Sequence, residues 1–149
     1  MLARTHIVAG LFLVLAFLSV VSNVGVFVPV VLLASLLPDI DSAYSYFGQH
    51  RIFRPLQFFV KHRGVVHSLT LAVLISLLFS LCLPVVAFPF FLGYAGHLFF
   101  DSFSVEGIRP FWPFGKEISG RIRVGGSIEW GIFVFFVVVD VFMLLSLFV

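Results

Sequence analysis

From Ile7 to Leu37 the chain carries no ionisable side chain, and valine, leucine and phenylalanine dominate the stretch. A single helix over this range would be about 46 Å long at ~1.5 Å per residue, well beyond the ~30 Å hydrocarbon core of a bilayer. The sequence Asn23-Val24-Gly25 near its middle is typical of a turn. The range therefore predicts two short membrane spans, over residues 7–22 and 26–37, with Pro38 disturbing the end of the second.

The rest of the chain is similarly apolar. Hydrophobic residues make up 61% of the 149 residues and charged residues 11%, which is about half the charged share of soluble proteins. This composition predicts an integral membrane protein with one domain, residues 1–149. The single cysteine, Cys82, excludes an intrachain disulfide and a thiolate metal cluster. Nucleic acid is not an expected partner, because no basic run is interleaved with aromatic residues.

Three further apolar segments, residues 68–82, 85–100 and 128–149, complete a set of five predicted spans. Residues 42–61 are more polar, and their apolar side chains recur at roughly helical spacing, which is typical of an amphipathic helix lying in the membrane interface. We therefore expect an all-α fold: a polytopic bundle of about five short transmembrane helices with one interfacial amphipathic helix.

The basic residues indicate how such a bundle is oriented. With five spans, every lysine and arginine falls on the same side of the membrane, and the two opposite turns carry no charge. The positive-inside rule then places the N-terminus and both long loops in the cytoplasm. These basic residues are Arg4, Arg51, Arg54, Lys61, Arg63, Arg109, Lys116, Arg121 and Arg123.

Two pairs of ionisable residues interrupt the apolar background. His97 and Asp101 are four residues apart in a predicted helix, so both can bind one metal ion, or Asp101 can orient His97. Asp39 and Asp41 follow Pro38, and in a non-helical turn their carboxylates can converge on one cation. The ordinary alternative for this second pair is a helix stop with solvated acids.

A third group lies in His62-Arg63-Gly64-Val65-Val66-His67-Ser68. Two imidazoles five residues apart with a glycine between them suit a loop that enters a helix, with Ser68 near the N-cap. Arg63 has the geometry to hold a phosphate bidentately, and anchoring on the cytoplasmic side is the competing explanation.

Two more candidates stand at the starts of spans. His6 begins the first span and Glu129 the last, and the predicted topology brings both to the membrane face that holds the other groups. A capping histidine and a carboxylate favoured by a helix N-terminus are the ordinary explanations. Asp140 lies about three turns beyond Glu129, near the middle of the bilayer, so we place it outside the cluster.

Carboxylates and imidazoles gathered on one face are the ligand types of a hydrolytic metal site. Charged groups at membrane depth usually have a partner or a function. We therefore predict catalytic roles for Glu129, as ligand or general base, and for Arg63, which would stabilise an anionic substrate. The predicted metal ligands are His6, Asp39, Asp41, His62, His67, His97 and Asp101.

These motifs also carry a resemblance. The chain resembles the YdjM-like family of membrane-bound, metal-dependent hydrolases, described as LexA-regulated inner-membrane proteins, and is more distantly similar to zinc-dependent phospholipase C. Val66 departs from the family pattern, which usually has threonine there. The matching residues are His6, Leu36-Leu37-Pro38-Asp39-Ile40-Asp41, Phe47-Gly48-Gln49, His62-Arg63-Gly64, His67-Ser68, Gly93-Tyr94, His97, Asp101, Gly107 and Phe111-Trp112-Pro113-Phe114.

The resemblance implies a prokaryotic cytoplasmic (inner) membrane, and the predicted spans with the positive-inside rule give a multi-pass protein whose site faces the cytoplasm. It implies hydrolysis of a phosphoester or ester of a lipid, supported by a divalent metal, zinc first among the candidates, with the number of ions open. Membrane lipids are the expected partners, and a homodimer is left open. Two alternatives remain: a non-catalytic scaffold or regulatory protein with a structural metal or ion-pair cluster, and a small ion transporter that uses Asp140.

Overall fold

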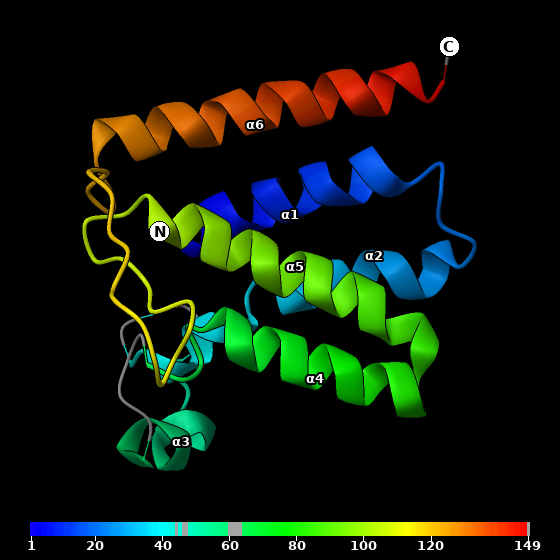
Figure 1. Cartoon of the computed structure of the whole chain (residues 1–149). Coiled ribbons are helices and arrows are strands. Elements are labelled where there is room, and N and C mark those ends of the chain that lie inside the picture. The colour runs from blue at the N-terminus through cyan, green and yellow to red at the C-terminus, as the bar shows by residue number, and fades with distance from the viewer. Residues whose placement is uncertain (44, 46–47, 60–63, 149) are drawn as a thin grey trace.

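The computed structural model describes residues 1–43, 45, 48–59 and 64–148. His62 and Arg63, two of the predicted site residues, lie outside the described residues. The predicted all-α fold is confirmed in the described part of the chain (Figure 1). The helices are α1 (Ala3–Phe17), α2 (Val24–Ala34), α3 (Arg54–Phe59), α4 (Leu69–Cys82), α5 (Pro84–Ser102) and α6 (Ser127–Ser146), with two 3₁₀ helices, η1 (Leu37–Asp41) and η2 (Arg51–Phe53).

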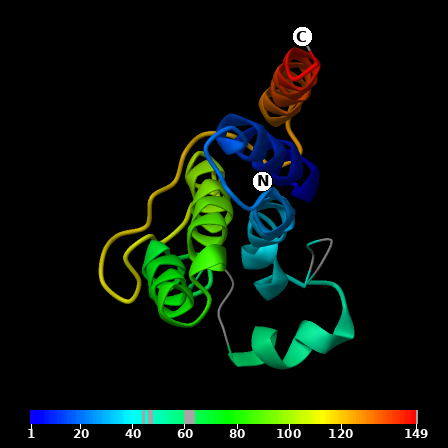
Figure 2. The ribbon, with the colours of Figure 1, turned by 90° about the vertical axis from the view of Figure 1, so that its right-hand side faces the viewer.

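The helix α5 is the centre of the bundle. It packs against α1, α2 and α4, whereas α6 lies along α1 at the periphery (Figures 1 and 2). Gly93 lets α5 approach α2 closely, because a Cβ atom there would lie 2.3 Å from the carbonyl oxygen of Val31. The main core consists of Ala34, Ala72, Phe90, Tyr94, Leu98 and Ile108. This packing fixes the position of the α5 face that carries His97 and Asp101.

The predicted division of the first apolar region is confirmed. Helix α1 ends at Phe17, and α2 begins at Val24. Asn23 is the N-cap of α2, where its side-chain oxygen accepts a hydrogen bond of 3.3 Å from the backbone N–H of Val26. An asparagine in this position satisfies one of the N–H groups that a helix start leaves unpaired, so it favours the start of α2 at Val24.

The predicted amphipathic helix over residues 42–61 is wrong in extent, because only η2 and α3 are helical in the described part of that range. The backbone N–H of Gly48 donates to Ser45 Oγ at 2.9 Å, and Gln57 Nε2 donates to the carbonyl of Gly48 at 2.7 Å. A Cβ atom at Gly48 would lie 2.0 Å from the Ser42 carbonyl oxygen. Local hydrogen bonds from serine and glutamine to the backbone therefore hold a tight turn in place of a helix.

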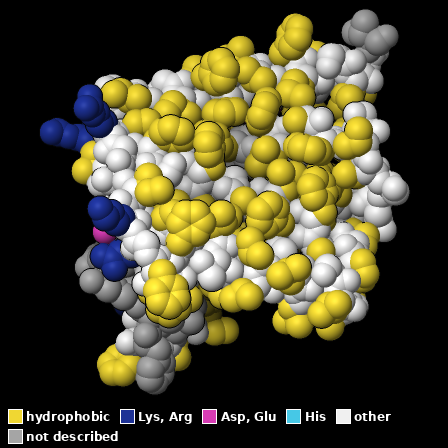
Figure 3. Space-filling view, viewed as in Figure 1, with side chains coloured by type: hydrophobic (Ala, Val, Ile, Leu, Met, Phe, Trp, Pro, Cys, Tyr) yellow, Lys and Arg dark blue, Asp and Glu magenta, His cyan; other side chains and the backbone are white. Residues whose placement is uncertain are grey.

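Within the described residues, three stretches are long and apolar enough to cross a membrane: Val24–Asp41, Pro84–Ser102 and Ser127–Ser146. Helices α1 and α4, with 15 and 14 residues, are shorter than the ~17–25 residues that usually span a bilayer. Hydrophobic side chains cover most of the molecular face in Figure 3, and the lysines and arginines visible there gather at one end. That end holds the start of α1, the end of α5 and the start of α6 (Figure 1).

Asp140 is buried in α6, with 3% of its surface exposed. Among the described residues, neither of its carboxylate oxygens has a hydrogen-bond partner. Burying a polar group without a partner costs about 1–3 kcal/mol in proteins. As predicted from the sequence, Asp140 is absent from the group of buried histidines and aspartates on the other helices.

We expect Asp140→Leu to stabilise the protein, by about 1–3 kcal/mol, because leucine removes this cost and fills the same position. The measurement is the thermal unfolding midpoint in detergent, compared with Val141→Leu, which changes an exposed neighbour on the same helix. A lower midpoint for Asp140→Leu would show that the carboxyl group has a stabilising partner, and would strengthen the ion-transport alternative.

Candidate metal centre

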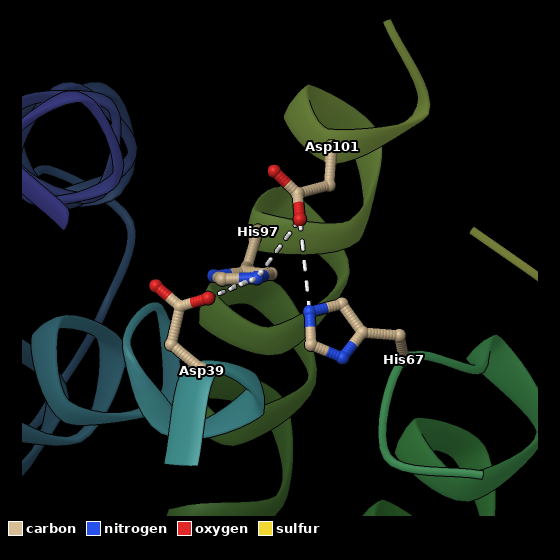
Figure 4. A group of neighbouring side chains, drawn as sticks. All are labelled: Asp39, His67, His97 and Asp101. Atoms are coloured by element: carbon tan, nitrogen blue, oxygen red, sulfur yellow. Dashed lines mark ion pairs between the residues drawn. The ribbon is translucent and has the colours of Figure 1, made fainter. Parts of the chain in front are cut away.

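His97 is held by α5 with its ring fixed in one tautomer. The side chain is 1% exposed, and Nδ1 lies 2.8 Å from the backbone carbonyl oxygen of Ser35. A carbonyl oxygen only accepts hydrogen bonds, so Nδ1 carries the proton and Nε2 presents its lone pair. That Nε2 lies 3.6 Å from Asp101 Oδ2 and 3.9 Å from Asp39 Oδ1 (Figure 4).

His67 enters the same space from the loop before α4. Ser68 is the N-cap of that helix, as predicted, and accepts a hydrogen bond of 3.2 Å from the Leu71 N–H. The Nδ1 atom of His67 lies 3.0 Å from Asp41 Oδ2, and its Nε2 lies 3.6 Å from Asp101 Oδ2. Burial lowers the pKa of His67, and the hydrogen bond with Asp41 opposes that effect. A lowered pKa favours the neutral imidazole, which is the form that binds metals.

Four side chains converge here: Asp39, His67, His97 and Asp101 (Figure 4). One ligand atom from each lies within 4.8 Å of all the others, and all four residues are buried. The contacts of 3.6 to 3.9 Å between imidazole nitrogens and carboxylate oxygens are too long for hydrogen bonds. In a tetrahedral zinc site with bonds of ~2.0–2.1 Å, two ligand atoms lie ~3.3 Å apart, and the distances here are only slightly longer. The group therefore has the donor types and the approximate spacing of a metal site.

The expectation that Asp39 and Asp41 lie in a non-helical turn and point to one cation needs correction. The two residues belong to the 3₁₀ helix η1, in which three residues complete a turn. Side chains two positions apart therefore point about 120° away from each other. Asp39 faces His97. Asp41 instead contacts Nδ1 of His67, whose other nitrogen, Nε2, faces Asp101.

His6 lies at the edge of this group. Its ring stacks on the ring of His97, with centroids 3.8 Å apart and 16° between the planes. His6 Nε2 lies 3.2 Å from Asp101 Oδ1, and the amino group of Met1 contacts the same oxygen. Asp101 thus faces His6 with Oδ1, and it faces His67 and His97 with Oδ2. This is the arrangement of a bridging carboxylate.

Glu129 is buried at the start of α6, where it connects α6 to α1. Its Oε1 accepts hydrogen bonds from the Leu2 N–H at 2.5 Å and from Thr5 Oγ1 at 3.0 Å. Its Oε2 accepts one from the Gly125 N–H at 2.6 Å. These contacts give Glu129 a structural function, and it is not among the four convergent residues. Its catalytic role stays a prediction.

Two groups that position the histidines were not predicted from the sequence. The Ser35 carbonyl fixes the tautomer of His97, but a backbone acceptor leaves no pattern in a sequence. The hydroxyl of Tyr94 donates to the carbonyl of Val66, the residue before His67. Tyr94 lies three residues before His97, and that helical spacing was the available signal. The contact uses the backbone of Val66, so valine in place of threonine preserves it.

We expect Asp41→Asn to weaken metal binding by about 10–100-fold, the usual cost of losing a partner that orients a ligating histidine. The asparagine keeps the size of the side chain and loses the charge that orients His67. The measurement is zinc competition against a chromophoric chelator. Glu117→Gln serves as the matched control because Glu117 is exposed. Equal affinities for Asp41→Asn and the unmodified protein would refute the orienting role.

The fold and the buried cluster together define a small helical membrane protein with a histidine–aspartate centre that could bind a metal. The chain belongs to the YdjM inner membrane protein family, whose profile matches residues 1–148, and the resemblance to that family is thereby confirmed. This membership and the apolar helices support an inner-membrane location.

Two curated relatives share this family likeness. The chain is 34% identical over 95 residues to inner membrane protein YdjM of Escherichia coli (strain K12). The alignment covers 58% of this chain and 48% of the relative. The protein of the same name from Shigella flexneri matches to the same extent. The chain thus spans about half the length of these curated relatives, and no solved structure matches it.

Proposed function

We propose that this protein is an integral membrane hydrolase that depends on a divalent metal, with zinc as the favoured ion. The observation that supports the proposal is the convergence of Asp39, His67, His97 and Asp101 at distances longer than hydrogen bonds. Two imidazoles and two carboxylates form a common donor set for zinc. Two carboxylates in one buried site repel each other, and a divalent cation relieves that repulsion.

A zinc ion held by these four residues would supply Lewis-acid polarisation of a phosphoryl or ester oxygen and would lower the pKa of bound water. The chain's own residues contribute orientation. The Ser35 carbonyl and Asp41 hold the two imidazoles with Nε2 turned inward. We assign Asp41 to this orienting role, and His6 to a second ligand position beside Asp101 Oδ1. Arg63 and His62 keep the roles expected from the sequence, anion binding and metal binding.

The proposed substrate is a phosphoester or ester of a lipid at the cytoplasmic interface. The cluster lies near the end of α5 and the start of α1, at the end of the bundle where basic side chains gather (Figures 1 and 3). The positive-inside rule assigns that end to the cytoplasm in a multi-pass topology. A site at this depth meets the head groups of the inner leaflet.

The test is hydrolysis of a panel of lipid head groups by the purified protein, with metal analysis of the same sample. The proposal expects turnover that a chelator abolishes, that added zinc restores, and that Asp101→Asn lowers by at least about 100-fold. Glu117→Gln should keep full activity, because that carboxylate is exposed and distant in sequence from the cluster. Metal-loaded protein that turns over no lipid of the panel would refute the proposed activity.

One observation favours a second candidate, a scaffold with a structural metal. The convergent residues are almost completely buried, from 0% exposed for His67 and Asp101 to 8% for Asp39. Structural metal sites are closed, whereas catalytic sites keep an open position. This candidate expects chelation to lower the unfolding midpoint without any lipid turnover by the loaded protein.

A further inference from the structure

Helix α6 leaves an apolar groove between itself and the end of α5. The groove has a volume of about 520 Å³, within the ~300–1,000 Å³ range of ligand pockets. Helix α6 packs along α1 (Figure 1), and the rings of Phe136 on α6 and Phe100 on α5 meet edge to face, with centroids 5.3 Å apart. Its walls include Phe100 and Phe103 from the α5 end, and Ile128, Ile132, Phe135 and Phe136 from α6.

The groove and the candidate metal centre share a wall. Met1 lines the groove, and its amino group contacts Asp101. Phe100, on the α5 side, is the residue before Asp101. The groove therefore borders the contact between the Met1 amino group and Asp101, whose carboxylate also faces His67 and His97.

The chemistry of the groove defines its occupant. Ile128 and Phe135 are each 61% exposed, so the groove opens on an apolar surface of the kind that faces lipid. Ile122 also lines it, and both chain neighbours of Ile122, Arg121 and Arg123, are exposed and positively charged. The apolar groove lies at the end of the bundle where lysines and arginines gather (Figure 3), and this combination is complementary to a molecule with an acyl chain and an anionic phosphate.

We infer that this groove binds one acyl chain of an anionic membrane phospholipid and thereby brings its head group to the metal centre. The second part of this inference rests on the proposed hydrolase function. The groove then defines the substrate class as an intact, acylated phospholipid taken from the bilayer. Soluble phosphoesters lack the chain that the groove holds, so they should be poor substrates.

Gly131 allows a direct test, because it lines the groove and a Cβ atom there meets no other atom within 4 Å. Leucine at this position fills the groove without a clash of its Cβ atom, and replacing a helix-interior glycine favours the helix. The matched control is Val138→Leu, since Val138 is 62% exposed on the same helix and is not a lining residue. Gly131→Ala adds only a methyl group and should give an intermediate effect.

The experiment uses the full chain in vesicles of phosphatidylethanolamine and phosphatidylglycerol that contain phosphatidylglycerol with a photoreactive acyl chain. Peptides that contain Phe100 and residues 128–136 should be labelled in excess over the exposed helix α4. Gly131→Leu should lower this excess by roughly tenfold, because the leucine displaces about two methylene groups of the acyl chain from the groove. Val138→Leu should leave the excess unchanged. Labelling that is even over all exposed helices, or insensitive to Gly131→Leu, would contradict acyl-chain binding in the groove.

The labelling readout requires neither metal nor turnover, so it separates the two proposals. Excess labelling without hydrolysis of any lipid would support the groove and refute the hydrolase. Lipid hydrolysis that Gly131→Leu leaves unchanged would contradict substrate binding in the groove and would support the proposed hydrolase function.

Discussion

His97→Ala should remove most of the metal from the purified protein, with an affinity loss greater than the ~10–100-fold cost of losing an outer partner. His97 provides the central Nε2, which lies 3.6 Å from Asp101 Oδ2 and 3.9 Å from Asp39 Oδ1. Without this nitrogen, the carboxylates of Asp39 and Asp101 lose the imidazole that lies near both of them. The measurement is the metal-to-protein ratio by elemental analysis after dialysis against a weak chelator.

The matched control for this change is His50→Ala, because His50 is exposed in the structure. The control should retain the full metal content. If His97→Ala and the unmodified protein bind the same amount of metal, then His97 is not a ligand and the cluster is an ion-pair network.

Gly93→Leu should disrupt both the fold and the site, with a loss of stability beyond the ~1–3 kcal/mol typical of overpacked cores. A Cβ atom at Gly93 would lie 2.3 Å from the carbonyl oxygen of Val31 and 3.0 Å from Ala34 Cβ, so α2 must move away from α5. That movement separates the Ser35 carbonyl from His97 Nδ1. The measurements are the unfolding midpoint in detergent and the metal content of the same sample.

Gly131→Leu is the control for this second change, since it introduces the same side chain into a helix where the Cβ atom meets nothing within 4 Å. It should keep a midpoint at or above that of the unmodified protein. A Gly93→Leu protein with a normal midpoint and normal metal content would contradict the close packing of α2 on α5.

The sequence was sufficient to predict the apolar helices because the signals for them are local. Asn23 has an oxygen that caps a helix, and the uncharged range around it was too long for one span. The basic residues predicted that the polar groups lie at one end of the bundle, and four of the predicted ligands do converge. The i, i+4 spacing predicted that His97 and Asp101 lie close together.

The remaining features depend on geometry that residue types do not encode. The separation of Asp39 from Asp41 follows from the 3₁₀ helix η1, and the sequence there reads equally well as a turn. The three hydrogen bonds that Glu129 accepts from Leu2, Thr5 and Gly125 join segments far apart in the sequence, so no local pattern predicts them, and its catalytic role stays a prediction. The amphipathic helix was overextended because hydrophobic spacing does not register the close turn at Gly48.

The central claim is that Asp39, His67, His97 and Asp101 bind one metal ion, and anomalous scattering tests it most directly. Crystals of zinc-loaded protein, measured above and below the zinc absorption edge, should show a peak enclosed by Asp39 Oδ1, His67 Nε2, His97 Nε2 and Asp101 Oδ2. The expected distances from the ion to these atoms are about 2.0–2.2 Å. Zinc-loaded crystals without a peak there, and with these side chains joined by direct hydrogen bonds, would contradict the claim.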